Sequence, residues 1–306
     1  MRAMPEPLPL VSICIPTHDD AAVVGDALRS VLLQDYIAME VLVLDNCSAD
    51  DTERVVQHTA TGDGRVRYVR HDSDIGMAAN FSACVHMARG EFVQILCADD
   101  ALEPGCVTFL AEALSQHVDA ALAACGRKLT DESLRPSRVL RARDRRELVP
   151  GPVLARECFA RGNRIGEPSA VMFRRGAAAR GFNAEYNQLV DLEMWLHLLA
   201  HGPAVLLPQP LCRVRQHGRQ ATQTNIRSGR LIEDKRRLFR QFEAAFAPAL
   251  GVAEKLRWDT RMASSVARMR AAGGVLDARA IAEVFFRRLF AQVLVPAVTL
   301  ARRGIA

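Results

Sequence analysis

The chain has 306 residues, of which 49% are hydrophobic and 25% charged, and its formal net charge is +5. This is the composition of an ordinary globular protein, which excludes a disordered or fibrous chain. The eight cysteines form no CxxC pair, and no stretch has the apolar length of a signal peptide or a spanning helix. We therefore expect reduced core thiols and a cytoplasmic protein.

Strand and helix patterns alternate along the chain. Apolar runs predict strands at 10–15, 40–44, 66–69, 92–96, 120–124, 170–173 and 205–207. Helical spacing predicts helices at 21–34, 77–88, 104–116 and around 191–199, and another that Ser48 or Asp50 caps. The alternation indicates an α/β fold with a mostly parallel sheet and helices on both faces. Segment 135–146, with six arginines, reads as a surface excursion.

Ligands of such sheets bind at the carboxyl ends of the strands. That rule gathers segments 16–20, 45–48 and 99–100 along one rim. Asp99 and Asp100 directly follow the buried strand pattern at 92–96, and adjacent carboxylates repel each other unless a cation lies between them. A hard divalent cation that carries a phosphate-bearing ligand answers this repulsion. Taken alone, the pair fits two solvated acids in a turn equally well.

Three rim segments, VSICIPTHDD, VLVLDNCSADDT and DIGMAANFSACVHMARGEFVQILCADD, change this balance. In this order and spacing they resemble family 2 glycosyltransferases with the GT-A fold, over about residues 8–220. The resemblance implies an inverting transfer of a sugar from a nucleotide-diphosphate donor to an acceptor, with Mg²⁺ or Mn²⁺. It implies a GT-A domain at 1–225, with a nucleotide-binding half at about 8–125 and an acceptor-binding half at about 150–220, followed by a basic helical tail at 226–306.

The resemblance also assigns roles to individual residues. It places Asp99 at the last acid of the DxD-type metal motif, and His217, in a segment that resembles Arg-x-His, as a second metal ligand. Arg215 or His217 could also reach the diphosphate. It assigns a further set of residues to binding of the nucleotide and the donor sugar, namely Pro16, Thr17, His18, Asp19, Asp45, Asn46, Asn80 and Asp100. A helix N-cap is the alternative for Asp45, and a surface position the alternative for His217.

The sequence departs from the family pattern at several of these positions. Cys97 stands where the first acid of the DxD motif usually lies, so metal coordination would rest on Asp99. His18 replaces a common Tyr, Asp19 a common Asn, and Asp74 the Asn that usually precedes Ile-Gly. These departures affect individual contacts more than the family resemblance itself.

Segment NQLVDLEMWLHLL resembles the family's Glu-Asp-x-Asp-hydrophobic-Trp signature. It implies that Asp191 is the catalytic base and that Glu193 and Trp195 lie in the acceptor pocket. An inverting transfer needs a carboxylate that takes the proton of the acceptor hydroxyl. A helix cap is the alternative role for Asp191.

The basic tail carries 16 Lys and Arg against 7 Asp and Glu in residues 227–306, whereas residues 1–226 carry 24 against 28. Its apolar stretch at 284–303 contains arginines and a proline, which favours a helix lying on the inner face of the cell membrane over one spanning it. Packing on the catalytic domain, or on a partner subunit of a homo-oligomer, is the equal alternative. A nucleic-acid partner fits poorly because the rim is acidic.

The sequence thus predicts a glycosyltransferase of surface polysaccharide or glycolipid assembly, with a lipid-linked or saccharide acceptor. Two alternatives stay open: a non-catalytic sugar-nucleotide-binding relative and a nucleotidyltransferase. A dehydrogenase is disfavoured because no GxGxxG follows the first strand.

Overall fold

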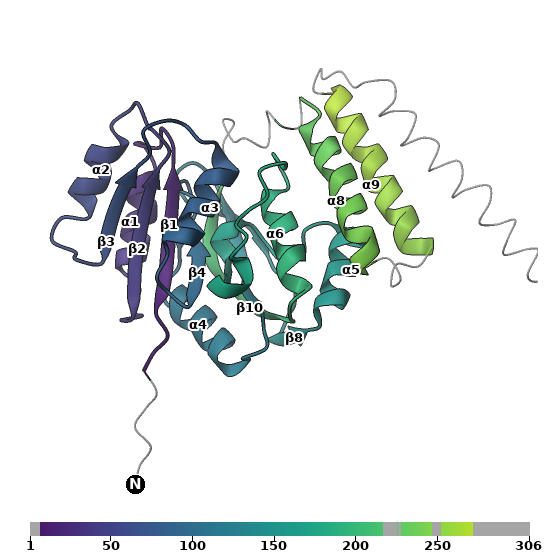
Figure 1. Cartoon of the computed structure of the whole chain (residues 1–306), viewed down its shortest axis with the longest axis horizontal. Helices are drawn as coiled ribbons and strands as arrows, with labels where there is room; N and C mark the ends of the chain where they lie inside the picture. Colours follow the sequence, from purple (N-terminus) through teal and green to yellow (C-terminus); the bar gives the residue numbers. More distant parts are fainter. Residues whose placement is uncertain (1–6, 217–224, 226–227, 247–251, 272–306) are drawn as a thin grey trace, which may run out of the picture. The chain divides into compact units, whose positions relative to one another are not determined.

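The computed structural model of the chain describes residues 7–216, 225, 228–246 and 252–271 (Figure 1). Its strands are β1 (Val11–Thr17), β2 (Met39–Asp45), β3 (Val66–Arg70), β4 (Phe92–Ile95), β5 (Ala101–Leu102), β6 (Leu122–Thr130), β7 (Pro136–Leu140), β8 (Glu147–Val149), β9 (Val171–Arg174) and β10 (Ala204–Arg215). Its helices are α1 (Val24–Leu32), α2 (Thr52–Thr59), α3 (Met77–Met87), α4 (Cys106–Gln116), α5 (Gly151–Arg161), α6 (Val190–Leu199), α8 (Arg230–Phe246) and α9 (Val252–Ala271), with 3-10 turns η1 (Pro168–Ala170) and η2 (Arg175–Ala178).

The strands form one sheet in the order β3-β2-β1-β4-β9-β6-β10-β5, with β7 beside β6 and β8 beside β10. Strands β3, β2, β1 and β4 run parallel, as do β6 and β10, whereas β9 is antiparallel to both β4 and β6. Because β9 is antiparallel to both β4 and β6, those two strands run in the same direction. Strands β3, β2, β1, β4, β6 and β10 therefore end at one edge of the sheet, and β9 begins there. The predicted α/β class with a GT-A-type sheet is confirmed.

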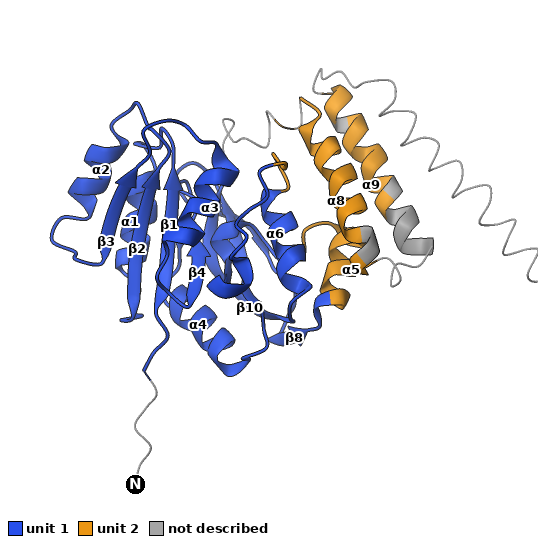
Figure 2. Cartoon of the chain, in the orientation of Figure 1, with its two compact units in different colours: residues 1–151, 165–184, 190–217 blue, residues 152–164, 185–189, 218–306 orange. Residues whose placement is uncertain are grey.

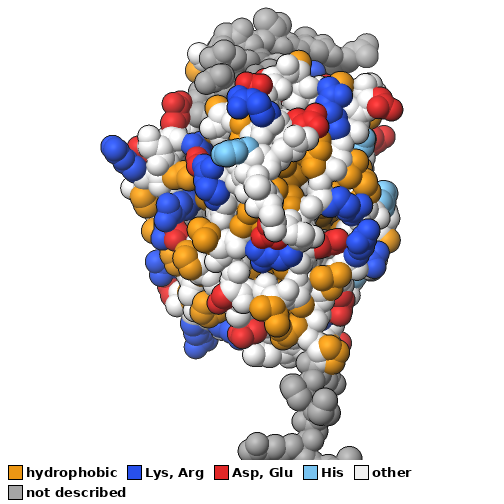
Figure 3. Space-filling model, turned by 90° about the vertical axis from the view of Figure 1, so that its left-hand side faces the viewer, with side chains coloured by type: hydrophobic (Ala, Val, Ile, Leu, Met, Phe, Trp, Pro, Cys, Tyr) orange, Lys and Arg blue, Asp and Glu red, His pale blue; other side chains and the backbone are white. Residues whose placement is uncertain are grey.

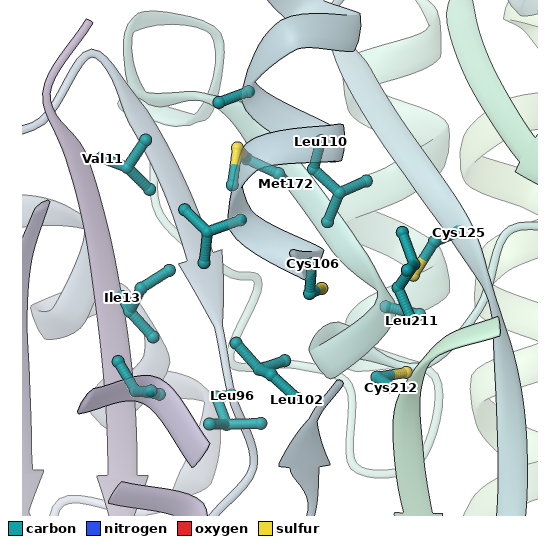
Figure 4. Close-up of a cluster of buried hydrophobic side chains, with 14 of the residues drawn as sticks. Val11, Ile13, Leu96, Leu102, Cys106, Leu110, Cys125, Met172, Leu211 and Cys212 are labelled. Carbon is teal, nitrogen blue, oxygen red and sulfur yellow. The ribbon is translucent and has the colours of Figure 1, made fainter. Parts of the chain in front are cut away.

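Different helices cover the two faces of the sheet, because side chains alternate along a strand. Val11, Ile13 and Ile15 of β1 belong to the large core that also contains apolar residues of α1 and α4, and Figure 4 shows part of it. Cys14 points to the other face, where its thiol donates to the Cys84 carbonyl oxygen of α3 at 3.6 Å. Each fully buried aliphatic side chain contributes roughly 1.5–3 kcal/mol, so this core fixes the positions of the strand ends.

The arginine-rich segment 135–146 lies on the surface, as predicted, and its first part forms the regular strand β7. Strand β7 within it pairs antiparallel with β6, with Arg138 opposite Leu129, and four of its five residues are exposed. Pairing with β6 supplies the backbone hydrogen bonds, so this edge strand does not need a buried face.

The chain divides into two compact units (Figure 2). Unit 1 comprises residues 1–151, 165–184 and 190–217 and holds the whole sheet, and unit 2 comprises 152–164, 185–189 and 218–306. In unit 2, Phe159 of α5 meets the ring of Trp258 from α9 at 5.4 Å between centroids, and Phe239 of α8 stacks on Trp258 at 5.6 Å. The tail expected at 226–306 therefore shares a compact unit with residues from the middle of the chain, and the predicted domain boundary stays a prediction.

Asp234 of α8 organises a second part of unit 2. This carboxylate is fully buried, and its Oδ2 accepts the backbone N–H groups of Asn187 (2.9 Å), Gln188 (2.5 Å) and Leu189 (2.9 Å). Nearby, the side-chain amide of Asn225 donates to the Asn187 carbonyl oxygen at 3.2 Å. A single acidic side chain thus satisfies three consecutive backbone donors.

Asp234→Ala is expected to lower the free energy of unfolding by about 3 kcal/mol, because hydrogen bonds to a charged acceptor are strong and their donors would stay buried. Asp234→Asn is the matched control. It keeps one acceptor oxygen and should lose less than half as much. Urea denaturation followed by tryptophan fluorescence measures both variants, and equal stability of Asp234→Ala and the unchanged protein would contradict this account.

Within the described residues, no helix combines the length and the apolarity that crossing a bilayer requires. The stretch at 284–303, for which the sequence predicts contact with a membrane surface, lies outside them.

Figure 3 shows the face on the side of α2 and β3, where basic, acidic and apolar side chains are interspersed. Two ion pairs lie near these elements in the sequence, Arg54 with Asp51 at 2.8 Å by the start of α2 and Arg65 with Asp63 at 2.7 Å before β3. Exposed pairs of this kind stabilise a protein by less than about 1 kcal/mol.

Candidate functional site

The strand ends bring the predicted rim segments together. Strands β1, β2 and β4 end at Thr17, Asp45 and Ile95, and the parallel ladder β6–β10 ends at the same edge with Arg215. Strand β9 starts at this edge, directly after the 3-10 turn η1, which contains Ser169. The sheet topology therefore assembles one site from segments far apart in the sequence.

The turn after β4, residues 97–100, is the most acidic part of this site. One ligand atom from each of Cys97, Asp99 and Asp100 lies within 4.8 Å of the others. Asp100 is buried, with Oδ2 accepting the Ser169 hydroxyl at 2.5 Å and Oδ1 accepting the Arg215 backbone N–H at 3.0 Å. The Ser169 hydroxyl oxygen also accepts the Cys97 N–H at 3.1 Å. This network fixes the turn, while Cys97 and Asp99 keep exposed surface.

Arg215 ties the turn to other elements through its guanidinium group, which is almost fully buried. Nε donates to the Asp99 carbonyl oxygen at 2.7 Å, a terminal nitrogen donates to Asp26 Oδ2 of α1 at 3.0 Å, and the other donates to the Glu132 carbonyl oxygen. These contacts give Arg215 an internal role in shaping the turn. His217, the other residue predicted for the diphosphate or the metal, lies outside the described residues.

Like charges crowd the turn. Burial and the charge of Asp99 raise the pKa of Asp100 well above its usual value, and burial and the two neighbouring acids raise the pKa of the Cys97 thiol. Burial also raises the pKa of Asp20, in the first loop, with a further contribution from the charge of Asp99. A divalent cation would relieve all of these interactions at once. The two carboxylates of the turn therefore fit a divalent cation of the kind that the family resemblance implies.

The predicted site residues at the end of β1 and in the loop after it differ in their exposure to solvent. Pro16 and Thr17 are buried, whereas His18 and Asp19 are exposed. Asp19 has a φ of 55°, a left-handed conformation that non-glycine residues rarely adopt, and its Oδ1 accepts the Ala49 N–H at 2.7 Å. This contact holds the first loop against the second, and so does His18 Nδ1, which lies 2.8 Å from the Asn46 carbonyl oxygen. Both side chains stay about half exposed.

The loop after β2 is closed by its own hydrogen bonds. Asp45 is fully buried, and its carboxylate accepts the Tyr68 hydroxyl at 2.6 Å and the Ser48 N–H at 2.7 Å. Burial and this carboxylate together raise the pKa of Tyr68 above its ordinary value. Asp45 therefore holds this loop from inside, and its predicted contact with the base or ribose stays a prediction.

Two buried amides continue this part of the rim. The Asn46 side chain donates to Asp74 Oδ1 at 2.5 Å and accepts the Ile75 N–H at 2.9 Å. Asn80 of α3 donates to the Leu44 carbonyl oxygen at 3.1 Å, while its own Oδ1 has no partner among the described residues. Both amides therefore hold loops together from behind the surface.

Asp191 lies in the first turn of α6 and is partly buried. Burial, as the largest cause, and the charge of Glu167 raise its pKa to about 7, against the opposing effect of Arg127. The charge of Asp191 contributes to the raised pKa of Cys97, which places the two groups within electrostatic reach. A carboxylate with this pKa is well suited to take a proton at neutral pH.

Glu193 and Trp195 require a correction. Both side chains are fully buried: Glu193 pairs with Arg180 at 2.7 Å, and the Trp195 indole N–H donates to the Gly166 carbonyl oxygen at 3.0 Å. The Trp195 ring also packs against Phe173 of β9. Neither side chain has surface that an acceptor could touch, so their predicted place in the acceptor pocket becomes a supporting role behind it.

Sequence reasoning missed several residues of the site. Ser169, which bridges Asp100 and Cys97, belongs to no recognisable motif when the chain is read alone. Arg127 at the carboxyl-terminal part of β6 forms an ion pair with Glu167, and both charges act on Asp191. The position of Arg127 in a strand that ends at the rim was the available signal.

The fold is that of GT-A glycosyltransferases. The S. aureus protein TarS (residues 1–349) matches with a TM-score of 0.67 over 92% of this chain and 80% of its own, at 15% identity. The mannosyltransferase PcManGT from Pyrobaculum calidifontis, solved with GDP-Man and Mn²⁺, matches with a TM-score of 0.58 over 94% and 82%, at 20% identity. At this level of identity the likeness concerns the fold alone.

The chain belongs to glycosyl transferase family 2, whose sequence profile matches residues 12–182, and the protein is thus a glycosyltransferase. An uncharacterized Mycobacterium tuberculosis protein is 32% identical over 75% of this chain and 74% of its own length. The Campylobacter jejuni GalNAc(5)-diNAcBac-PP-undecaprenol beta-1,3-glucosyltransferase is 33% identical over 34% of each chain. Escherichia coli chondroitin synthase is 27% identical over 64% of this chain, which spans only 27% of that protein.

Proposed function

We propose that this glycosyltransferase moves a sugar from a nucleotide-diphosphate donor to an acceptor hydroxyl with inversion, and that Asp191 is the base. The observation that carries this proposal is the pairing of an acidic turn with a carboxylate whose pKa is about 7 within electrostatic reach of it. The acidic turn would hold the cation that binds the leaving diphosphate, and the Asp191 carboxylate would take the proton of the attacking hydroxyl.

In the proposed reaction, the acceptor oxygen attacks the anomeric carbon from the face opposite the diphosphate. Asp191 takes the hydroxyl proton as the new C–O bond forms, and the old bond breaks with its electron pair leaving on the diphosphate. Asp191 then returns the proton to solvent, which a pKa of about 7 makes easy. One carboxylate is therefore sufficient for the proton chemistry.

Mg²⁺ or Mn²⁺ is the proposed cofactor, held by Asp99 with Asp100 behind it. Bound there, it would neutralise charge on the leaving diphosphate. Asp100 is held by Ser169 and Arg215, so it would act by fixing the turn. His217 stays a predicted ligand outside the described residues.

The nucleoside is proposed to bind the rim formed by the first two loops. His18 and Asp19 offer exposed side chains there, while Pro16 and Thr17 shape the backbone behind them. The other predicted contacts are buried, and they are proposed to support this rim from behind: Asp45, Asn46 and Asn80.

The acceptor is proposed to be a lipid-linked or saccharide hydroxyl. The undecaprenol-linked substrate named for the Campylobacter relative supports a lipid-linked acceptor, and the relatives named for colanic acid and succinoglycan biosynthesis support a role in polysaccharide assembly. We propose that the chain works at the cytoplasmic face of the membrane, with peripheral contact through 284–303. A homo-oligomer stays a prediction.

A screen of UDP-, GDP- and dTDP-sugars with Mn²⁺ tests the proposed function. We expect one donor class to raise the melting temperature and to be hydrolysed slowly without an acceptor. Binding without hydrolysis or transfer would favour a non-catalytic sugar-nucleotide-binding relative. Release of pyrophosphate from a nucleoside triphosphate and a sugar phosphate would favour a nucleotidyltransferase.

The rate of transfer should depend on pH through Asp191. Its folded pKa is raised to about 7, so the carboxylate form that acts as base is lost as the pH falls below that value. We expect kcat to fall about tenfold for each pH unit well below 7 and to level off above 8. Glu167→Gln removes a charge that raises this pKa, so its profile should move to lower pH. An unchanged profile in that variant would contradict the assignment.

A further inference from the structure

Cys97 occupies an unusual position among the cysteines of this chain. All eight are reduced, and six are buried, while only Cys47 and Cys97 are partly exposed. Cys97 lies in the acidic turn, with its Sγ, one carboxylate oxygen of Asp99 and one of Asp100 within 4.8 Å of one another. The Cys97 thiol therefore lies beside the two carboxylates of the proposed cation site.

The backbone around this thiol is held firmly. The Cys97 N–H donates to Ser169 Oγ at 3.1 Å, and the Ser169 hydroxyl donates to Asp100 Oδ2 at 2.5 Å. Because Ser169 is fully buried, the Cys97 backbone is anchored to the same network that fixes Asp100. A ligand on a fixed backbone needs little reorganisation to bind an ion.

The three groups of the turn are not equivalent as ligands. Both oxygens of the buried Asp100 already accept protein hydrogen bonds, from Ser169 and from the Arg215 backbone. Cys97 and Asp99 are the members with exposed surface.

We propose that Cys97 Sγ, together with the Asp99 carboxylate, is a direct ligand of the divalent cation, so that this site prefers thiophilic ions such as Zn²⁺ or Co²⁺ to Mg²⁺. The proposal rests on the cation site of the proposed function. Mg²⁺ requires an oxygen shell, whereas thiolate sulfur selects softer ions. When the S–metal bond forms, the thiol proton is released to solvent.

Titration of Co²⁺ into the full-length protein, without any donor, tests this directly. A sulfur-to-cobalt charge-transfer band in the near ultraviolet is expected for the unchanged protein and for the control Cys47→Ser. Cys97→Ser should lose the band and bind Co²⁺ at least about tenfold more weakly, since even outer-shell changes cost that much. No band in the unchanged protein, or a band that survives Cys97→Ser, would overturn the proposal.

Cys97→Asp gives the reverse test, because it introduces an oxygen ligand at the same backbone position. In competition with Co²⁺, the ratio of Co²⁺ affinity to Mg²⁺ affinity should fall at least about tenfold in this variant. An unchanged ratio would also overturn the proposal. Circular dichroism of each variant confirms that it is folded.

The proposed function is tested separately. Sugar transfer that proceeds with Mg²⁺, combined with no Co²⁺ band, would leave the glycosyl transfer intact and remove the role of Cys97. A Co²⁺ band that depends on Cys97, combined with no response to any sugar nucleotide, would keep the metal site and remove the proposed function.

Discussion

Asp191→Asn is expected to lower kcat for sugar transfer by about 10²–10⁴-fold, the usual contribution of a positioned general base. Asn has nearly the same shape but cannot take the acceptor proton at neutral pH. Donor binding should stay within about threefold of the unchanged protein, because the proposed donor contacts come from the rim loops and the acidic turn. Steady-state kinetics with the donor identified by the screen, alongside calorimetric donor binding, measures both quantities.

Stability distinguishes this base from a structural acid. The folded-state pKa of Asp191 is raised, so the folded protein holds this proton more tightly than the unfolded chain does. Ionisation of Asp191 therefore opposes folding, and its contribution becomes less favourable as the pH rises from about 4 to about 7. Asp191→Asn should be at least as stable as the unchanged protein at pH 8. Lower stability with unaltered kcat would indicate a helix cap and remove the base.

Much of the fold could be predicted from local sequence patterns. The buried runs that form β1, β2 and β4 have almost continuous apolar residues, which is typical of parallel strands covered on both faces. Since parallel strands end at one edge, their order along the chain was sufficient to bring segments 16–20, 45–48 and 99–100 together. The position of the site follows from this rule.

The hydrogen bonds that hold the site together could not be predicted, because they join residues that are distant in the sequence. Ser169 reaches Asp100 across 69 positions, and Arg215 reaches it across 115. No local pattern distinguishes these side chains from other polar residues near strand ends. The same limit explains Trp195: helical spacing relates it to Asp191, but only the packing of β9 shows that its ring is buried.

The acidic turn contains side chains whose ionisation destabilises the folded protein. Burial is the largest cause of the raised pKa values of Asp100 and Asp20, and the charge of Asp99 raises both further. At neutral pH these interactions destabilise the cation-free protein, since each raised pKa measures the unfavourable free energy of ionisation in the folded state. Functional sites commonly retain such destabilising arrangements. A side chain retained for function should therefore improve stability when it is removed.

Asp99→Asn is expected to lower activity without lowering stability. Loss of the carboxylate ligand removes several kcal/mol of charge stabilisation in the transition state, which corresponds to a loss of about 10²-fold or more in transfer. The same change lowers the pKa values of Asp100 and Asp20 towards their ordinary range, so the cation-free variant should melt no lower than the unchanged protein at pH 7. The rise in melting temperature that the cation causes should disappear.

Asp100→Ala is the contrasting variant. It leaves the Ser169 hydroxyl and the Arg215 N–H buried without their acceptor, which should lower the free energy of unfolding by about 1–3 kcal/mol. Thermal melts of both variants with and without Mn²⁺ make the comparison. If Asp99→Asn melted lower than the unchanged protein in the absence of a cation, Asp99 would be a structural acid like its neighbour. The repulsion in the turn would then need an explanation other than a bound ion.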